Sequence, residues 1–79
     1  MVDTSFMEAT VRTVLPEAKI KATDTTGGGD HWHVLVEDDA FEGLRPLARQ
    51  KIVLAAFKPH LASNEVHALD LSCKAPGEK

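Results

Sequence analysis

Three histidines are the side chains best suited to chemistry in this 79-residue chain. His31 and His33 follow a run of three glycines and open an apolar segment. His67 lies near the C-terminus, in the segment Val66-His67-Ala68-Leu69. Imidazole nitrogens bind transition metals and exchange protons near neutral pH. The histidines are therefore candidate ligands of a metal site. The simpler alternative is that each histidine is an isolated polar side chain on a strand.

Alternating apolar and polar residues predict the strands that would carry these histidines. The first strand is expected from Glu17 to Thr25 and the second from His31 to Glu37. The glycine-rich loop Thr25–Asp30 between them predicts an antiparallel hairpin. A third strand, containing His67, is expected from about Glu65 to Cys73. In the second strand, one face would carry Trp32, Val34 and Val36, and the other His31, His33 and Leu35.

Helical spacing predicts two longer helices. The first runs from about Asp3 to Leu15, with Asp3 or Thr4 as its N-cap and Pro16 ending it. The second begins at Pro46, whose fixed φ suits the first turn. It should end or kink near Phe57 or Lys58, because Pro59 removes a backbone hydrogen bond. Its predicted buried stripe consists of Leu47, Leu54, Phe57 and Leu61, widened by Ile52, Val53, Ala55 and Ala56.

The order of these elements predicts an α+β fold in one domain, residues 1–79, with residues 1–2 and 75–79 frayed. Residues 38–43 form a turn or a single helical turn before the long helix. A three-stranded sheet with helices on one face would bury this pattern. Because the last strand follows a helical crossover, it should pair parallel to one hairpin strand and give a mixed sheet. So small a domain leaves little room for a deep active-site cavity, which favours a binding module over an enzyme.

Composition narrows the setting of the protein. The formal net charge is −3. No apolar run approaches the roughly 20 residues needed to span a bilayer, and the N-terminus resembles no secretory signal. We therefore expect a cytoplasmic protein without membrane association. Cys73 is the single cysteine, so no intramolecular disulfide can form, and we expect a half-buried thiol outside the site.

Several segments in order resemble the BolA-like family: Phe41-Glu42-Gly43-Leu44, the following helix with Leu47, Arg49-Gln50, Ile52-Val53 and Ala55-Ala56, and Val66-His67-Ala68-Leu69. The resemblance extends from the first helix to Lys74. It implies the order α-β-β-α-α-β, similar to a type II KH domain, and an adaptor rather than a catalyst.

The same resemblance implies a partner and a cofactor. BolA-like proteins pair with monothiol glutaredoxins and share a bridging 2Fe–2S cluster with them. The glutaredoxin would contribute a cysteine and bound glutathione. The ligands from this chain would be His67 and a residue of the loop between the first two strands, here His31 with His33 as the rival. No cluster is expected in the isolated protein.

A second class of function remains open, a nucleic-acid-binding transcriptional regulator that uses the basic face of the long helix. Its contacts would be Arg45, Arg49, Lys51 and Lys58. The acidic net charge argues against strong phosphate binding, and the Gly-x-x-Gly clamp of KH domains is absent after the second strand. The same residues would equally suit an acidic protein partner or an ordinary solvated helix face. The sequence also leaves open whether the chain forms a homodimer when alone.

Overall fold

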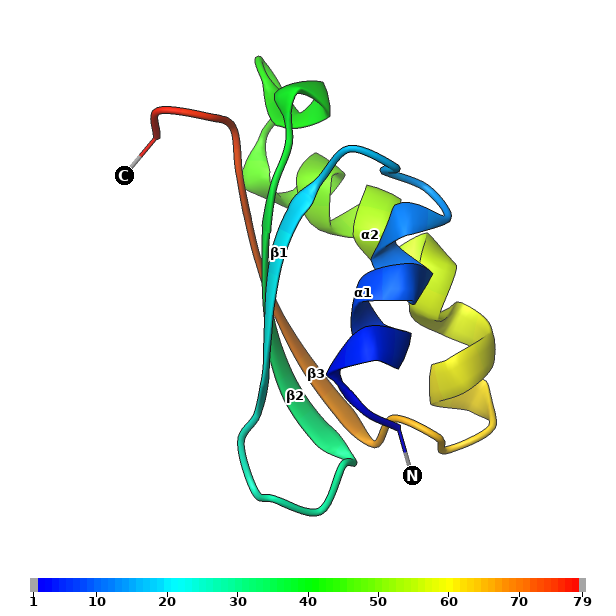
Figure 1. The fold of residues 1–79 in the computed structure, drawn as a ribbon. Helices are drawn as coiled ribbons and strands as arrows, with labels where there is room; N and C mark the ends of the chain where they lie inside the picture. The colour runs from blue at the N-terminus through cyan, green and yellow to red at the C-terminus, as the bar shows by residue number, and fades with distance from the viewer. Residues whose placement is uncertain (1, 79) are drawn as a thin grey trace.

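Two helices cover one face of a three-stranded sheet (Figure 1). The computed structural model describes residues 2–78. Along the chain, the elements are α1 (Thr4–Arg12), β1 (Lys19–Asp24), β2 (His31–Glu37), a 3₁₀ helix (Asp39–Phe41), α2 (Pro46–Ala62) and β3 (Ala68–Lys74). The predicted α+β class is confirmed, and the 3₁₀ helix lies where a turn or single helical turn was expected. Among the described residues, no helix is both long and apolar enough to cross a membrane.

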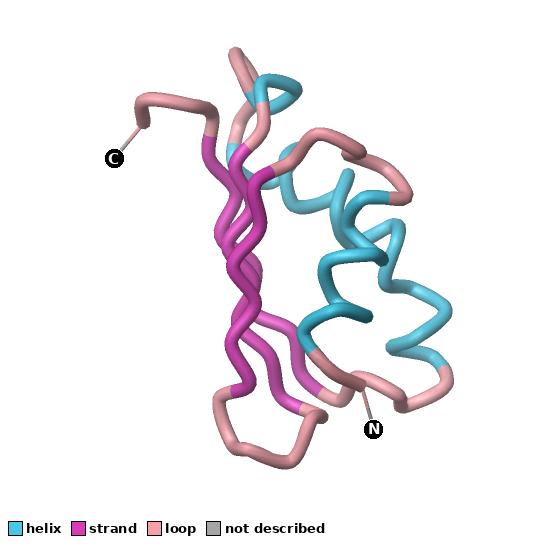
Figure 2. The backbone as a smooth tube through the Cα atoms, viewed as in Figure 1, coloured by secondary structure: helices cyan, strands magenta, loops and turns pink. Residues whose placement is uncertain are grey.

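Strand β2 is the central strand of the sheet, antiparallel to β1 and parallel to β3. The predicted hairpin and mixed sheet are therefore confirmed. Figure 2 shows the strands in magenta, with both helices on the same side of them. Because β2 and β3 are parallel, both begin at the same end of the sheet, where His31 is opposite Ala68. The loops that precede these two strands must also meet at that end.

The core lies between the sheet and the helices. Burial alternates along β2, as expected for a strand that has one face on the core. Asp3 caps α1 through a 2.9 Å bond from the Phe6 backbone N–H to its carboxylate. The largest fully buried side chains are Met7, Val11, Val34, Val36, Phe41, Val53, Phe57 and Val66.

The predicted buried stripe of α2 is largely wrong. The buried residues of the helix are Arg49, Val53 and Phe57, whereas Leu47 is 67% exposed and Leu54 36% exposed. Successive residues are about 100° apart around a helix, so Leu47 lies about 200° from Arg49 and faces solvent. Apolar residues occur all round this helix. The face that packs against the sheet is the one whose buried residues are spaced four apart.

An end or a kink was predicted for this helix near Phe57 or Lys58. The end is wrong, because α2 continues through Pro59 to Ala62. Contacts on both sides of the proline hold this last turn. Phe57 is fully buried, and the ring of His60 packs edge-on against Phe6, with ring centroids 4.7 Å apart. These contacts offset the hydrogen bond that Pro59 removes.

The fraying expected at residues 1–2 and 75–79 stays a prediction, although several of these residues make contacts in the structure. Val2 and Ala75 are buried, and Glu78 accepts two hydrogen bonds from the Arg49 guanidinium, of 2.5 and 2.8 Å. These bonds lower the pKa of Glu78 to about 2. Met1 and Lys79, which were also predicted to fray, lie outside the described residues.

Candidate functional site

His67 lies in the bend just before β3, not within the strand as predicted. Val66 is fully buried, and its backbone N–H bonds to the carbonyl of His60, so the chain is still turning at this point. The His67 backbone N–H donates to the Asp30 carbonyl at 2.8 Å, and the N–H of Ala68 donates to the same oxygen at 3.1 Å. The backbone that carries the exposed His67 side chain is therefore fixed to the loop that precedes β2.

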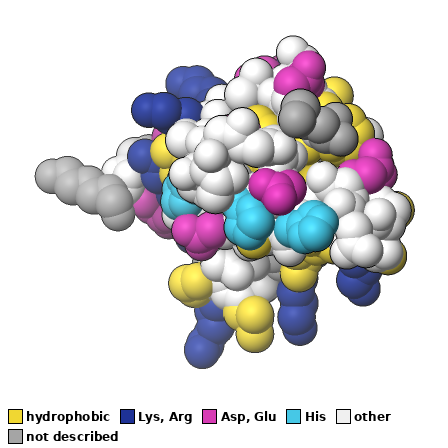
Figure 3. Space-filling view, turned by 90° about the horizontal axis from the view of Figure 1, so that it is seen from below, with side chains coloured by type: hydrophobic (Ala, Val, Ile, Leu, Met, Phe, Trp, Pro, Cys, Tyr) yellow, Lys and Arg dark blue, Asp and Glu magenta, His cyan; other side chains and the backbone are white. Residues whose placement is uncertain are grey.

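The fold brings His31 and His67 together, although they are far apart in sequence. Their ring centroids are 6.3 Å apart, with the ring planes tilted by 34°. Figure 3 looks at this end of the molecule and shows histidine side chains next to acidic ones at the surface. The parallel pairing of β2 and β3 is the cause, because it places the start of both strands at one end.

Asp30 is a residue of this site that the sequence analysis missed. Its carboxylate Oδ1 lies 3.0 Å from Nδ1 of His31. This hydrogen bond is the main reason that the pKa of Asp30 is lowered, with smaller contributions from the charges of His31 and His67, while burial opposes the shift. The available signal was an acidic residue directly before a histidine, at the end of the glycine run.

His33 has a different partner. Its Nδ1 lies 2.9 Å from Asp70 Oδ2, across the β2–β3 pair. It shares the uncovered face of the sheet with His31, and both line a shallow groove of about 490 Å³. The ring near His67 is nevertheless that of His31. The other residues that line this groove are Thr25, Trp32, Ala68, Leu69 and Asp70.

The loop before His31 is ordered by Asp24. Its carboxylate accepts hydrogen bonds from three backbone N–H groups, those of Thr26, Gly27 and Gly29, at 3.2, 2.9 and 2.8 Å. Gly27 and Gly29 have φ of 82° and 78°, a backbone region that glycine enters without steric cost. The Asp24 carboxylate and the two glycines together stabilise the turn that positions Asp30 and His31 in the site.

The two imidazoles fit a shared metal site better than a complete one. With a nitrogen–metal distance of about 2.1 Å, two imidazoles on one ion have ring centres about 5 to 6 Å apart. The observed 6.3 Å is close to this spacing. Within residues 2–78, no group of three or more His, Cys, Asp or Glu side chains is arranged to hold a metal ion. A four-coordinate site here would need ligands from another molecule.

The sequence matches the family model described as BolA-like protein over residues 4–78. The chain belongs to the BolA-like family.

Individual relatives agree with this assignment. The chain is 34% identical to BolA-like protein 1 of Bos taurus, over 91% of this chain and 61% of that protein. It is 25% identical to the acid stress protein IbaG of Escherichia coli strain K12, over 86% of this chain and 82% of that one. The structure of a bolA protein homologue from Coxiella burnetii superposes with a TM-score of 0.80 at 32% identity, covering 96% of this chain and 94% of the other. Family and fold are thereby confirmed.

Arg49 does not lie on the exposed face of α2 in this BolA-like protein. It is 8% exposed, and besides Glu78 it donates to the carbonyl oxygens of Leu44 and Cys73. Its guanidinium therefore joins α2, the edge of β3 and the C-terminal tail. The other basic residues of the predicted contact set, Arg45, Lys51 and Lys58, are exposed.

Cys73 is half-buried, as expected, and burial raises the pKa of its thiol. A raised thiol pKa leaves less of the reactive thiolate at neutral pH. Neither a nucleophilic nor a metal-binding role is indicated for this residue in the BolA-like chain.

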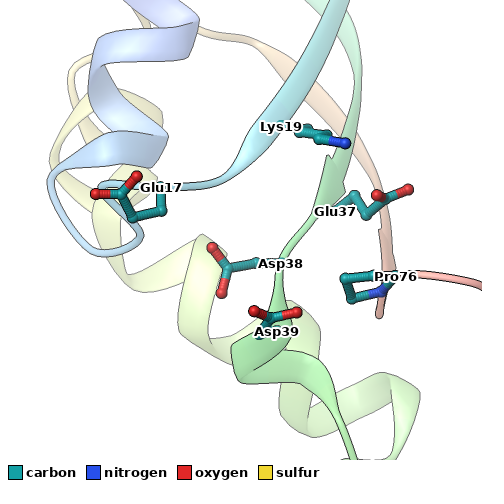
Figure 4. A pocket seen from close by; sticks show the side chains of 6 residues that line it. All are labelled: Glu17, Lys19, Glu37, Asp38, Asp39 and Pro76. Carbon is teal, nitrogen blue, oxygen red and sulfur yellow. The ribbon is translucent and has the colours of Figure 1, made fainter.

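A second depression, of about 280 Å³, lies at the opposite end of the sheet (Figure 4). Four carboxylates and a lysine contribute to it, but Figure 4 shows them spread around the opening, without a common point. Asp38 accepts a 2.8 Å bond from the Ala40 N–H and so caps the 3₁₀ helix. This acidic end has a structural explanation. Its lining is Glu17, Lys19, Glu37, Asp38, Asp39 and Pro76.

Proposed function

We propose that this BolA-like protein is an adaptor in iron–sulfur cluster assembly, trafficking or sensing. It would bind a monothiol glutaredoxin and supply His31 and His67 to a 2Fe–2S cluster that the two proteins share. The observation that supports this most strongly is the 6.3 Å approach of the two rings at the surface. The remaining ligands would be a cysteine of the glutaredoxin and its bound glutathione.

The residues of the chain suit such a half-site. The Asp30 carbonyl fixes the backbone of His67, and the Asp30 carboxylate restrains the ring of His31. Both imidazoles remain accessible, so a partner can approach them. When bound, the cluster would supply one-electron redox chemistry, at a potential raised by imidazole relative to thiolate ligation. We infer an adaptor and not an enzyme, because the site contains no nucleophile paired with a base.

Imidazole ligation also suggests how the complex would respond to acid. A histidine must be neutral to bind a metal, so protons compete with the cluster for His31 and His67. The Escherichia coli relative is named an acid stress protein. Carried to this chain as part of the proposal, an acid-linked role agrees with a cluster that is released as the pH falls.

Anaerobic reconstitution with a monothiol glutaredoxin and glutathione tests the proposal. We expect visible absorbance and circular dichroism bands from the heterodimer. His67→Ala and His31→Ala should shift these bands and speed cluster loss. His33→Ala is the matched control, since His33 is also half-exposed on β2 but bonds to Asp70. If His67→Ala leaves the spectrum, potential and lability unchanged, the ligand assignment is wrong.

The regulator that binds nucleic acid is the weaker candidate. Internal bonding of Arg49 leaves Arg45, Lys51 and Lys58 as the exposed basic residues of the predicted set. The similarity to type II KH domains, DNA binding, a homodimer and a cytoplasmic location stay predictions. Fluorescence anisotropy at several salt concentrations separates the two functions. Phosphate binding would weaken steeply with salt and on replacing Arg45 and Lys58 by alanine.

A further inference from the structure

Asp30 contacts both histidines of the candidate site, through different atoms. Its carboxylate Oδ1 lies 3.0 Å from Nδ1 of His31, while its backbone carbonyl accepts the N–H of His67 at 2.8 Å. One residue thus restrains the ring of the first histidine and the main chain of the second. Asp30 lies in the loop that the Asp24 carboxylate organises, so its own position is restrained.

The short contact between Asp30 and His31 determines which ring nitrogen carries the hydrogen. An aspartate is ionised at neutral pH and can only accept hydrogen bonds. Nδ1 of His31 must therefore be the donor. In the neutral imidazole, the lone pair that binds a metal is then on Nε2.

We propose that Asp30 is a positioning residue that keeps His31 in the Nδ1–H tautomer and so makes Nε2 its metal-binding nitrogen. The tautomer is a property of the isolated chain. The metal-binding part rests on the proposed function. Metal-bound histidines commonly donate their other ring N–H to a carboxylate, which fixes the ring orientation and makes the ligand nitrogen more basic.

His33 and Asp70 provide an internal comparison. Nδ1 of His33 lies 2.9 Å from Asp70 Oδ2, so the same type of bond occurs a few residues away. Asp70 has no bond to the backbone of His67, whereas Asp30 does. A variant of Asp70 therefore removes one carboxylate–histidine bond without disturbing the residue that joins the two loops.

Nitrogen-15 NMR of the histidine rings in the isolated full-length protein tests the tautomer directly, at a pH where the rings are neutral. We expect His31 to be mainly Nδ1–H in the wild type. Asp30→Ala should move it toward the mixture of an unrestrained histidine. Asp30→Asn, which keeps an acceptor oxygen, should retain much of the Nδ1–H form. Asp70→Ala should alter His33 and leave His31 unchanged.

A wild-type His31 that is mainly Nε2–H overturns the inference without any variant. An unchanged His31 tautomer in a folded Asp30→Ala protein overturns it as well. Signal dispersion in the NMR spectrum reports whether each variant is folded.

The metal-binding part is tested in the heterodimer with glutaredoxin and glutathione. Loss of a histidine's carboxylate partner typically lowers metal affinity 10- to 100-fold. The complex of the Asp30→Ala variant should therefore lose its cluster to a chelator roughly 10- to 100-fold faster than the complex of the Asp70→Ala variant. Equal rates, in a complex that depends on His31, overturn the part of the inference in which Asp30 positions His31 for metal binding. A cluster that does not depend on His31 refutes the proposed function, whereas the NMR result still decides the tautomer.

Discussion

Pro59 allows a stability prediction with a defined sign. It lies within α2, three positions before the last helical residue, and its side chain is exposed. Proline in a helix interior costs about 3 kcal/mol relative to alanine. Pro59→Ala would restore an N–H able to donate to the carbonyl four residues earlier, and it would sacrifice no buried contact.

Part of that gain is cancelled in the unfolded state. Proline restricts the unfolded chain, and losing this restriction costs about 0.4–1 kcal/mol. We therefore expect Pro59→Ala to raise the free energy of unfolding by about 2 kcal/mol. For a domain of this size, that corresponds to a melting temperature higher by about 8–16 °C.

Urea denaturation and thermal unfolding measure the effect, and Pro46→Ala is the control. Pro46 is at the first position of the same helix, where no N–H is needed. Its replacement should lower stability by about 0.4–1 kcal/mol, the opposite sign. A Pro59→Ala protein no more stable than the wild type would refute the reasoning, and would mean that the helix had already adapted to the proline. The His31–His67 approach should survive in this variant, because the His67 backbone is bonded to Asp30 and not to the helix.

Three further predictions concern stability. The pKa of Glu78 is about 2 in the folded protein, against an ordinary 4.5. The ion pair of Glu78 with Arg49 therefore stabilises the fold above about pH 4.5, and this stabilisation is lost as the pH falls toward 2. In thermal unfolding, the loss of stability caused by Glu78→Gln should be largest at neutral pH and vanish in strong acid. Trp32→Phe removes a buried 3.0 Å bond to a loop carbonyl and should cost about 1–2 kcal/mol in urea denaturation, whereas an unchanged midpoint would show that water replaces the bond. Phe57→Ala should lower the free energy of unfolding by about 3–5 kcal/mol, and Leu47→Ala by less than about 0.5 kcal/mol. A similar loss for both variants would support the buried stripe predicted from sequence.

Local patterns were enough to predict most of the secondary structure. The bounds of β2, His31–Glu37, agree with the sequence prediction because strict alternation with Trp32, Val34 and Val36 has one interpretation. The start of α2 at Pro46 followed equally from the fixed φ of proline. Errors occurred where several local interpretations were possible, as with the face of α2 that meets the sheet.

The sequence by itself determined the class of the fold, the hairpin and the histidines as candidate ligands, because these depend on residue type and short-range spacing. Only the tertiary structure decided that His31, and not His33, is the ring near His67. It alone showed that Asp30 links the loop before β2 to the backbone of His67, and that Arg49 lies inside the molecule. The physical reason is that these contacts depend on the parallel pairing of β2 with β3 and on the packing of α2 against the sheet. Both join residues far apart in the chain, where no sequence periodicity extends.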